Sequence, residues 1–86
     1  VLFMRNHGVL ICGSSIGEAF CRMDDLEKAC KTQIGVLSTN QNIIQPSESI
    51  AELTKSQYDT LGRPAGETEW PAMKRMLERL GVEYKS

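Results

Sequence analysis

The stretch VLFMRNHGVLICGSSIGEAF, residues 1–20, decides the fold expected for this chain. Apolar residues fill positions 1–4, and a polar group with the chain's single histidine separates them from the apolar residues 9–12. Because Gly8 can take a positive φ, residues 6–8 predict a turn or bulge between two strands. A strand that is apolar on both faces is typical of a buried position between two neighbours. We therefore expect a buried strand over residues 1–6 and a short second strand over residues 9–12.

A long helix is predicted directly after these strands. Ser15 and Glu18 have the spacing of a capping box, in which the serine hydroxyl accepts from the Glu18 amide and the glutamate accepts from the Ser15 amide. Apolar residues then recur at spacings of three and four, which places them on one face of a helix over residues 16–38. We expect this apolar stripe to face a core; it consists of Ile16, Ala19, Phe20, Met23, Leu26, Cys30, Ile34 and Leu37.

Two further helices are predicted in the second half of the chain. Pro46 and Ser47 begin the first, and the glycine- and proline-containing residues 62–66 end it. Its apolar residues are Ile50, Leu53, Tyr58 and Leu61. In the last helix Thr68 is the expected N-cap, Pro71 fits the first turn because no hydrogen bond is lost there, and Gly81 allows a left-handed stop. Its inward face is expected to hold Trp70, Met73, Met76, Leu77 and Leu80.

Composition excludes several classes of protein. The 86 residues form one small domain at most. Ten basic residues against 11 acidic ones lack the positive excess of a nucleic-acid-binding domain. No apolar run approaches the ~20 residues of a membrane helix. The three cysteines form no C-x-x-C pair, so we expect reduced thiols in a cytoplasmic protein.

The beginning of the chain leads to an expectation about domain organisation. No initiating methionine is present, and the first strand needs a neighbour on both sides. We interpret residues 1–86 as the C-terminal fragment of a single domain whose N-terminal part is missing.

His7 is the first candidate for chemistry, and the residues around it leave two interpretations open. A lone histidine beside a turn is usually a surface or capping residue. A histidine at a strand end, held between Asn6 and Gly8, is also well placed to bind zinc, for which imidazole is a common ligand. Catalytic zinc uses about three protein ligands. Since the sequence has no second histidine, the other ligands would have to come from residues outside it.

Residues 1–33, VLFMRNHGVLICGSSIGEAFCRMDDLEKACKTQ, resemble a segment of the class II aldolase/adducin family. That segment has an apolar strand, RNHG, a second apolar strand, a glycine and a capped helix with E-A-F. Residues 69–81, EWPAMKRMLERLG, are similar to the family's C-terminal helix. The resemblance implies an α/β fold, in which the order strand, strand, helix, helix, helix is the C-terminal portion of an α/β/α sandwich with a central, mainly antiparallel sheet.

The resemblance also implies an enzyme in which histidines hold Zn²⁺ or another divalent metal, and His7 matches the histidine of NHG. The metal would polarise a small sugar phosphate or hydroxy-carbonyl substrate and stabilise an enediolate during aldol cleavage or related chemistry. Arg5 is a candidate for binding a phosphate or carboxylate, although it could equally pair with an acidic side chain. Tyr84 is a candidate for reaching a neighbouring subunit's site in a homotetramer. No catalytic residue is assigned, because the family's acid/base glutamate lies upstream.

The family includes a second class of function. In adducins the same domain serves cytoskeletal assembly, so an adducin-like chain would be non-catalytic and associate with actin and spectrin. His7 would then be retained for the turn. Both functions are consistent with the residues present.

Overall fold

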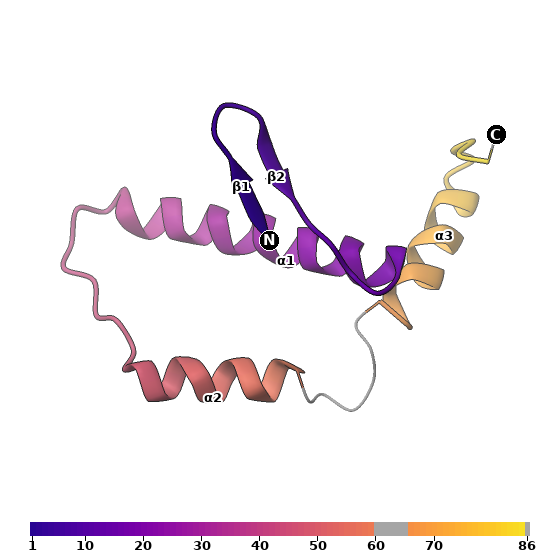
Figure 1. Ribbon diagram of the computed structural model, residues 1–86. Helices are drawn as coiled ribbons and strands as arrows, with labels where there is room; N and C mark the ends of the chain where they lie inside the picture. The colour runs from indigo at the N-terminus through magenta and orange to yellow at the C-terminus, as the bar shows by residue number, and fades with distance from the viewer. Residues whose placement is uncertain (60–65, 86) are drawn as a thin grey trace.

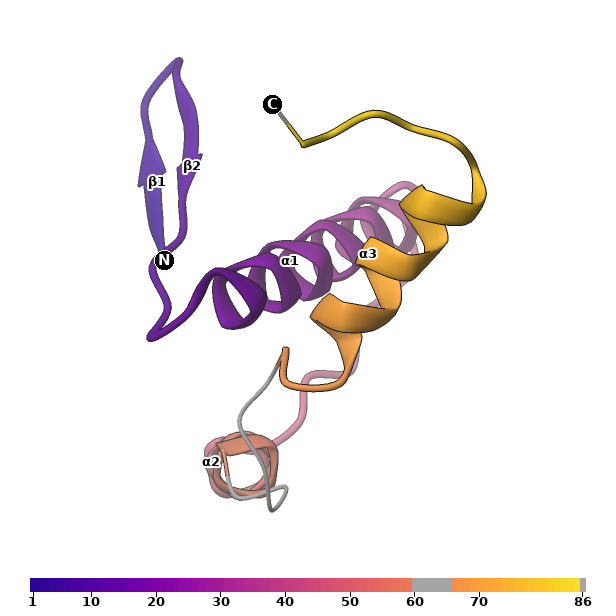
Figure 2. The same ribbon diagram turned by 90° about the vertical axis from the view of Figure 1, so that its right-hand side faces the viewer.

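The computed structural model describes residues 1–59 and 66–85. Its elements are β1 (Leu2–Met4), β2 (Gly8–Leu10), α1 (Ile16–Leu37), α2 (Glu48–Asp59) and α3 (Glu69–Arg79). Figure 1 shows a separate α2 and places α3 at the first turns of α1, and Figure 2 shows a hairpin that stands away from α1. The predicted element order is confirmed, and the elements agree with an α/β chain. The larger sandwich stays a prediction.

The hairpin turns at the predicted place, but its strands are shorter than expected. β1 and β2 are antiparallel, with Leu2 opposite Leu10 and Met4 opposite Gly8. The His7 amide closes the turn by donating to the Met4 carbonyl at 3.2 Å. Asn6 and Gly8 have φ values of 59° and 122°, which asparagine tolerates and glycine adopts without a steric penalty. The turn predicted at residues 6–8 is therefore confirmed.

The expectation that the first strand is buried is wrong. Every residue of β1 is exposed, and Phe3 retains 64% of its accessible surface. Within the described part of the chain, the sheet contains β1 and β2 alone. A two-stranded sheet leaves one edge of β1 unpaired, and only packing against another element could bury its faces.

Polar side chains define both ends of α1. Ser15 is the N-cap, and its Oγ accepts from the Glu18 amide at 3.1 Å, as the capping box predicts. At the other end the Ser38 hydroxyl donates to the Gly35 carbonyl and the Thr39 hydroxyl to the Val36 carbonyl, both at 2.8 Å. These bonds satisfy carbonyls that a helix end leaves without partners. The helix therefore ends within one residue of the predicted position.

The apolar stripe of α1 does not face a core, which corrects the prediction. No hydrophobic residue is fully buried among residues 1–59 and 66–85. Ala19, Leu26 and Cys30 are half-buried, whereas Ile34 keeps 68% of its surface exposed. The stripe has the predicted periodicity, but no element lies over its second half, where the chain turns away toward α2 (Figure 1).

The N-terminal end of α3 packs tightly against the first turns of α1 (Figure 2). Gly17 and Gly66 are buried there. A Cβ on Gly66 would lie 2.2 Å from the Gly17 carbonyl carbon, and a Cβ on Gly17 would lie 3.0 Å from the Trp70 Cβ. The rings of Phe20 and Trp70 meet beside these glycines, with centroids 5.4 Å apart and planes inclined by 54°. Side chains at either glycine would separate the two helices.

The caps of α3 agree with the sequence at one end only. Thr68 occupies the N-cap position, but its side chain makes no capping hydrogen bond. The Glu69 carboxylate instead accepts from the Gly66 amide at 3.0 Å. At the C-terminal end Gly81 has φ 68°, and its amide and that of Val82 donate to the Glu78 and Leu77 carbonyls. This is the glycine-based stop that the sequence predicts.

All residues of α2 are exposed. The Ser47 hydroxyl accepts from the Ile50 amide at 3.4 Å, so the helix begins where the sequence predicts. Leu61, the last residue of its predicted apolar face, lies outside the described residues. The Tyr58 hydroxyl donates to the Asp25 carboxylate of α1. Across the described ranges, no helix is both long and apolar enough to cross a bilayer.

Candidate functional site

His7 lies at the tip of the β1–β2 hairpin and is exposed. Its Nδ1 lies 3.0 Å from the Arg5 carbonyl oxygen. A carbonyl can only accept a hydrogen bond, so in the neutral imidazole this contact assigns the ring proton to Nδ1 and leaves the lone pair on Nε2. Histidines that bind metals commonly use this arrangement, because the hydrogen bond made by the second ring nitrogen fixes the tautomer and the ring orientation. The turn therefore supplies the orienting contact that a metal-binding imidazole needs.

His7 fits a metal site as a single ligand. Within residues 1–59 and 66–85, no group of three or more histidine, cysteine, aspartate or glutamate side chains converges. Zinc normally takes three or four protein ligands. Any ion bound to Nε2 would therefore need donors from residues beyond those described.

The structure places Arg5 beside His7 and Tyr84 elsewhere. Arg5 belongs to the same turn and is exposed. Tyr84 follows α3, and Figure 1 shows this end of the chain well away from the hairpin. Its hydroxyl donates to the Glu78 carboxylate at 3.1 Å, and Lys85 contacts the same carboxylate at 2.9 Å. The contacts with Lys85 and Tyr84 lower the pKa of Glu78.

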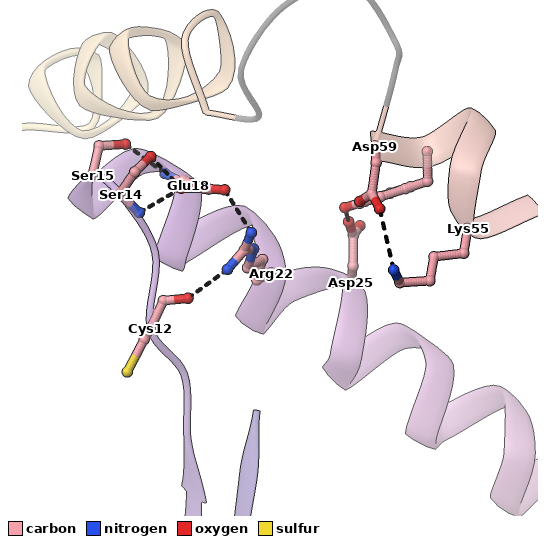
Figure 3. Close-up of polar contacts among 9 residues, drawn as sticks. Cys12, Ser14, Ser15, Glu18, Arg22, Asp25, Lys55 and Asp59 are labelled. Atoms are coloured by element: carbon pink, nitrogen blue, oxygen red, sulfur yellow. Dashed lines mark hydrogen bonds and ion pairs between the residues drawn. The ribbon is translucent and has the colours of Figure 1, made fainter.

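A polar cluster that sequence analysis missed joins the end of the hairpin to α1; we call Cys12, Ser14, Glu18 and Arg22 the clasp. Figure 3 shows Arg22 between two acceptors. Its guanidinium donates to the Glu18 carboxylate and to the Cys12 carbonyl, each at 2.7 Å. The Glu18 carboxylate also accepts from the Ser14 amide at 2.5 Å and from the Ser14 hydroxyl. The segment after β2 is thus bound to the first turns of α1.

The clasp corrects one part of the predicted capping box. Glu18 was expected to accept from the Ser15 amide, but it accepts from Ser14, one residue earlier. The bonds from Ser14, and then the charge of Arg22, lower the pKa of the Glu18 carboxyl. The spacing of Glu18 and Arg22 could have predicted their ion pair. The bond to the Cys12 carbonyl depends on the path of the backbone, which the sequence pattern does not specify.

The half-buried Cys21 is a poor candidate for a nucleophile. Its thiol is free. Burial, followed by the charges of Glu69 and Asp25, raises its pKa. Since the thiolate is the reactive form, a raised pKa keeps this residue in its unreactive state at neutral pH.

Comparisons with known proteins agree with the sequence motifs. The family model described as Class II Aldolase and Adducin N-terminal domain matches residues 1–34. A provisionally named aldolase class 2 protein of Pseudomonas aeruginosa is 30% identical over 88 residues, which cover 98% of this chain and 34% of the relative. A similarly named protein of Caulobacter vibrioides is 31% identical over 85 residues, covering 98% of this chain and 33% of the relative.

Adducins are also similar to the chain. Beta-adducin of Homo sapiens is 34% identical over 93 residues, which cover 94% of this chain and 13% of the adducin. The chain thus spans about a third of the two bacterial relatives and a smaller part of the adducin. No solved structure matches. The family match over residues 1–34 and these two groups of relatives confirm the predicted resemblance to the class II aldolase/adducin family.

Proposed function

We propose that this chain supplies His7 as one ligand of a divalent metal site in a class II aldolase-like enzyme, with Zn²⁺ as the expected ion. The observation that carries the proposal is the 3.0 Å contact between His7 Nδ1 and the Arg5 carbonyl. It leaves Nε2 as the available donor at an exposed turn. The family match supports the enzyme class.

The proposed substrate is a small sugar phosphate or hydroxy-carbonyl compound. The bound metal would act as a Lewis acid toward a carbonyl or hydroxyl oxygen. His7 would keep its proton on Nδ1 throughout, because the Arg5 carbonyl holds it there. The Arg5 guanidinium belongs to the same turn, and such a group binds phosphates and carboxylates in a fixed geometry. Tyr84 remains a candidate for contact with a neighbouring subunit's site.

We further propose that residues 1–86 form the C-terminal portion of one larger domain in a cytoplasmic homotetramer. The accessible surface supports the first part. It measures 7741 Å², whereas a compact protein of 9.6 kDa exposes roughly 5,100 Å². The excess includes apolar residues of β1 and α1, and covering these residues would stabilise the folded protein. Further parts of an α/β/α sandwich would cover them.

The alternative function is a non-catalytic, adducin-like assembly domain that associates with actin and spectrin. The 34% identity with human beta-adducin favours this alternative. Under it, His7 would serve the turn, where its amide bonds to the Met4 carbonyl. The two functions therefore differ in whether the imidazole binds a metal.

Zinc content of the full-length protein that contains this chain tests the proposal. We expect His7→Ala to lose at least about tenfold in zinc affinity, because one of about three protein ligands is removed. Asn6→Gly is the matched control, since glycine readily adopts the φ of 59° and His7 is kept. Equal zinc binding by His7→Ala and the wild type would reject the metal site and favour the adducin-like alternative.

A further inference from the structure

The clasp lies where the hairpin that carries His7 joins α1. Arg22 is one turn beyond Glu18 on α1, and its second acceptor is the carbonyl of Cys12, two residues after β2 ends. One guanidinium therefore binds α1 and the segment that follows β2 together (Figure 3). β2 also borders a hollow along α1, where Gly8 and Val9 lie opposite Met23 and Leu26.

The distance between the clasp and His7 makes this connection important. His7 precedes Cys12 by five residues, which span roughly 17 Å when extended. A tilt of about 2° at the clasp would then move the imidazole by about 0.5 Å, the tolerance of a functional site. The orientation of the hairpin on α1 must therefore be well defined if a ligand at its tip is to meet donors from other elements.

We propose that Arg22 is a positioning residue for His7, which it orients by bridging the Glu18 carboxylate and the Cys12 carbonyl. This inference rests on the proposed metal-binding role of His7. Arg22 does not contact the imidazole; it restricts the hairpin that presents it. The planar guanidinium suits the task because it can donate to two acceptors in different directions, whereas an ammonium is a compact point charge.

A second ion pair on α1 provides a matched control. Lys28 contacts Asp24 at 2.5 Å, with the same spacing of four residues as Glu18 and Arg22. The Asp24 side chain is 48% exposed, compared with 16% for Glu18. Lys28→Gln removes a helix ion pair without removing a bond to the hairpin, so it separates a general loss of helix stability from a loss of hairpin orientation.

The experiment measures zinc dissociation constants and thermal unfolding for four variants of the full-length protein that contains this chain: Arg22→Gln, Arg22→Lys, Lys28→Gln and His7→Ala. We expect Arg22→Gln to weaken zinc binding by up to about tenfold, because a hairpin that tilts presents His7 less precisely to the other donors. Arg22→Lys should lose less, since it keeps the pair with Glu18. Lys28→Gln should bind zinc like the wild type.

Two outcomes would overturn the inference, and they are distinguishable. If Arg22→Gln and Arg22→Lys bind zinc like the wild type while His7→Ala does not, Arg22 has no positioning role and the metal site stands. If His7→Ala itself binds zinc normally, the proposed function fails and the role of Arg22 fails with it. Should Arg22→Gln not fold, the zinc affinity of Arg22→Lys relative to Lys28→Gln decides.

Discussion

The two halves of α1 differ in how the rest of the chain is attached to them. The first half holds the clasp, the close approach of Gly17 to Gly66, and the pair of rings from Phe20 and Trp70. The second half leads into the segment before α2, which has no buried residue; the bond from Tyr58 of α2 reaches α1 at Asp25, near the middle of the helix. Attachments of several kinds are thus concentrated at one end of the helix.

This difference shows which contacts a short segment can complete by itself. Hydrogen bonds of the clasp join residues at most ten positions apart. Apolar side chains need a second surface, and Ile34 and Leu53 are exposed without one. The first half of α1 is therefore a defined support for the hairpin and α3, whereas the second half depends on additional packing for its stability.

Gly66→Ala tests the first half and has the largest expected effect. Gly66 has φ 90°, and its Cβ would meet the Gly17 carbonyl carbon at 2.2 Å. Because backbone atoms must move to relieve this clash, we expect undocking of α3 at a cost of about 3 kcal/mol or more. Emission of Trp70, the chain's single tryptophan, should shift to longer wavelength as it loses Phe20.

Gly35→Ala is the control for this prediction. A Cβ at Gly35 meets nothing within 4 Å, and the residue lies inside α1. Alanine should therefore stabilise the helix by up to about 1 kcal/mol and leave Trp70 emission unchanged. If both glycine substitutions left the Trp70 emission unchanged, that result would contradict the close contact between Gly17 and Gly66.

Local signals explain how much of this arrangement the sequence predicted. The turn around Asn6, the cap at Ser15 and the stop at Gly81 all depend on residues within a few positions of one another. The chain supplies the required φ angles and hydrogen-bond partners there, so pattern and structure agree. The proximity of His7 and Arg5 in the candidate site could be predicted for the same reason, because both residues belong to one turn.

The features that were missed depend on distant residues. The burial predicted for residues 1–6 and for the stripe of α1 requires partner surfaces that the described residues do not provide. Gly17 lies in the first turn of α1, and the sequence pattern gives no sign of its contact with Gly66, which is 49 positions away in the sequence. The clasp bond to Cys12 involves a backbone carbonyl, whose availability is independent of its side chain.

Ser15→Ala sharpens the comparison with an effect of intermediate size. The Ser15 hydroxyl accepts from the Glu18 amide, and losing such a cap costs about 1 kcal/mol. Thr68→Ala is the matched control, because Thr68 has the N-cap position of α3 but makes no capping bond. Urea unfolding followed by circular dichroism should show the loss for Ser15→Ala and almost none for Thr68→Ala. Equal losses would contradict the assigned caps.

Tyr58→Phe tests the attachment of α2 to the middle of α1 and has the smallest expected effect. Tyr58 is 48% exposed, so removing its bond to Asp25 should cost below about 1 kcal/mol in unfolding free energy.

The bond to the Asp25 carboxylate, followed by burial and the charge of Asp25, raises the pKa of Tyr58 from 10.0 to about 12. A raised pKa favours the protonated phenol in the folded chain, so the contribution is intact below pH 10 and is lost as pH rises through about 12. The pKa of Tyr58 is measured by alkaline titration of phenolate absorbance, in which the curve of Tyr58→Phe is subtracted from that of the wild type. In Asp25→Ala the same step should return toward pH 10, and a wild-type midpoint already near 10 would show that α2 is not held by this bond.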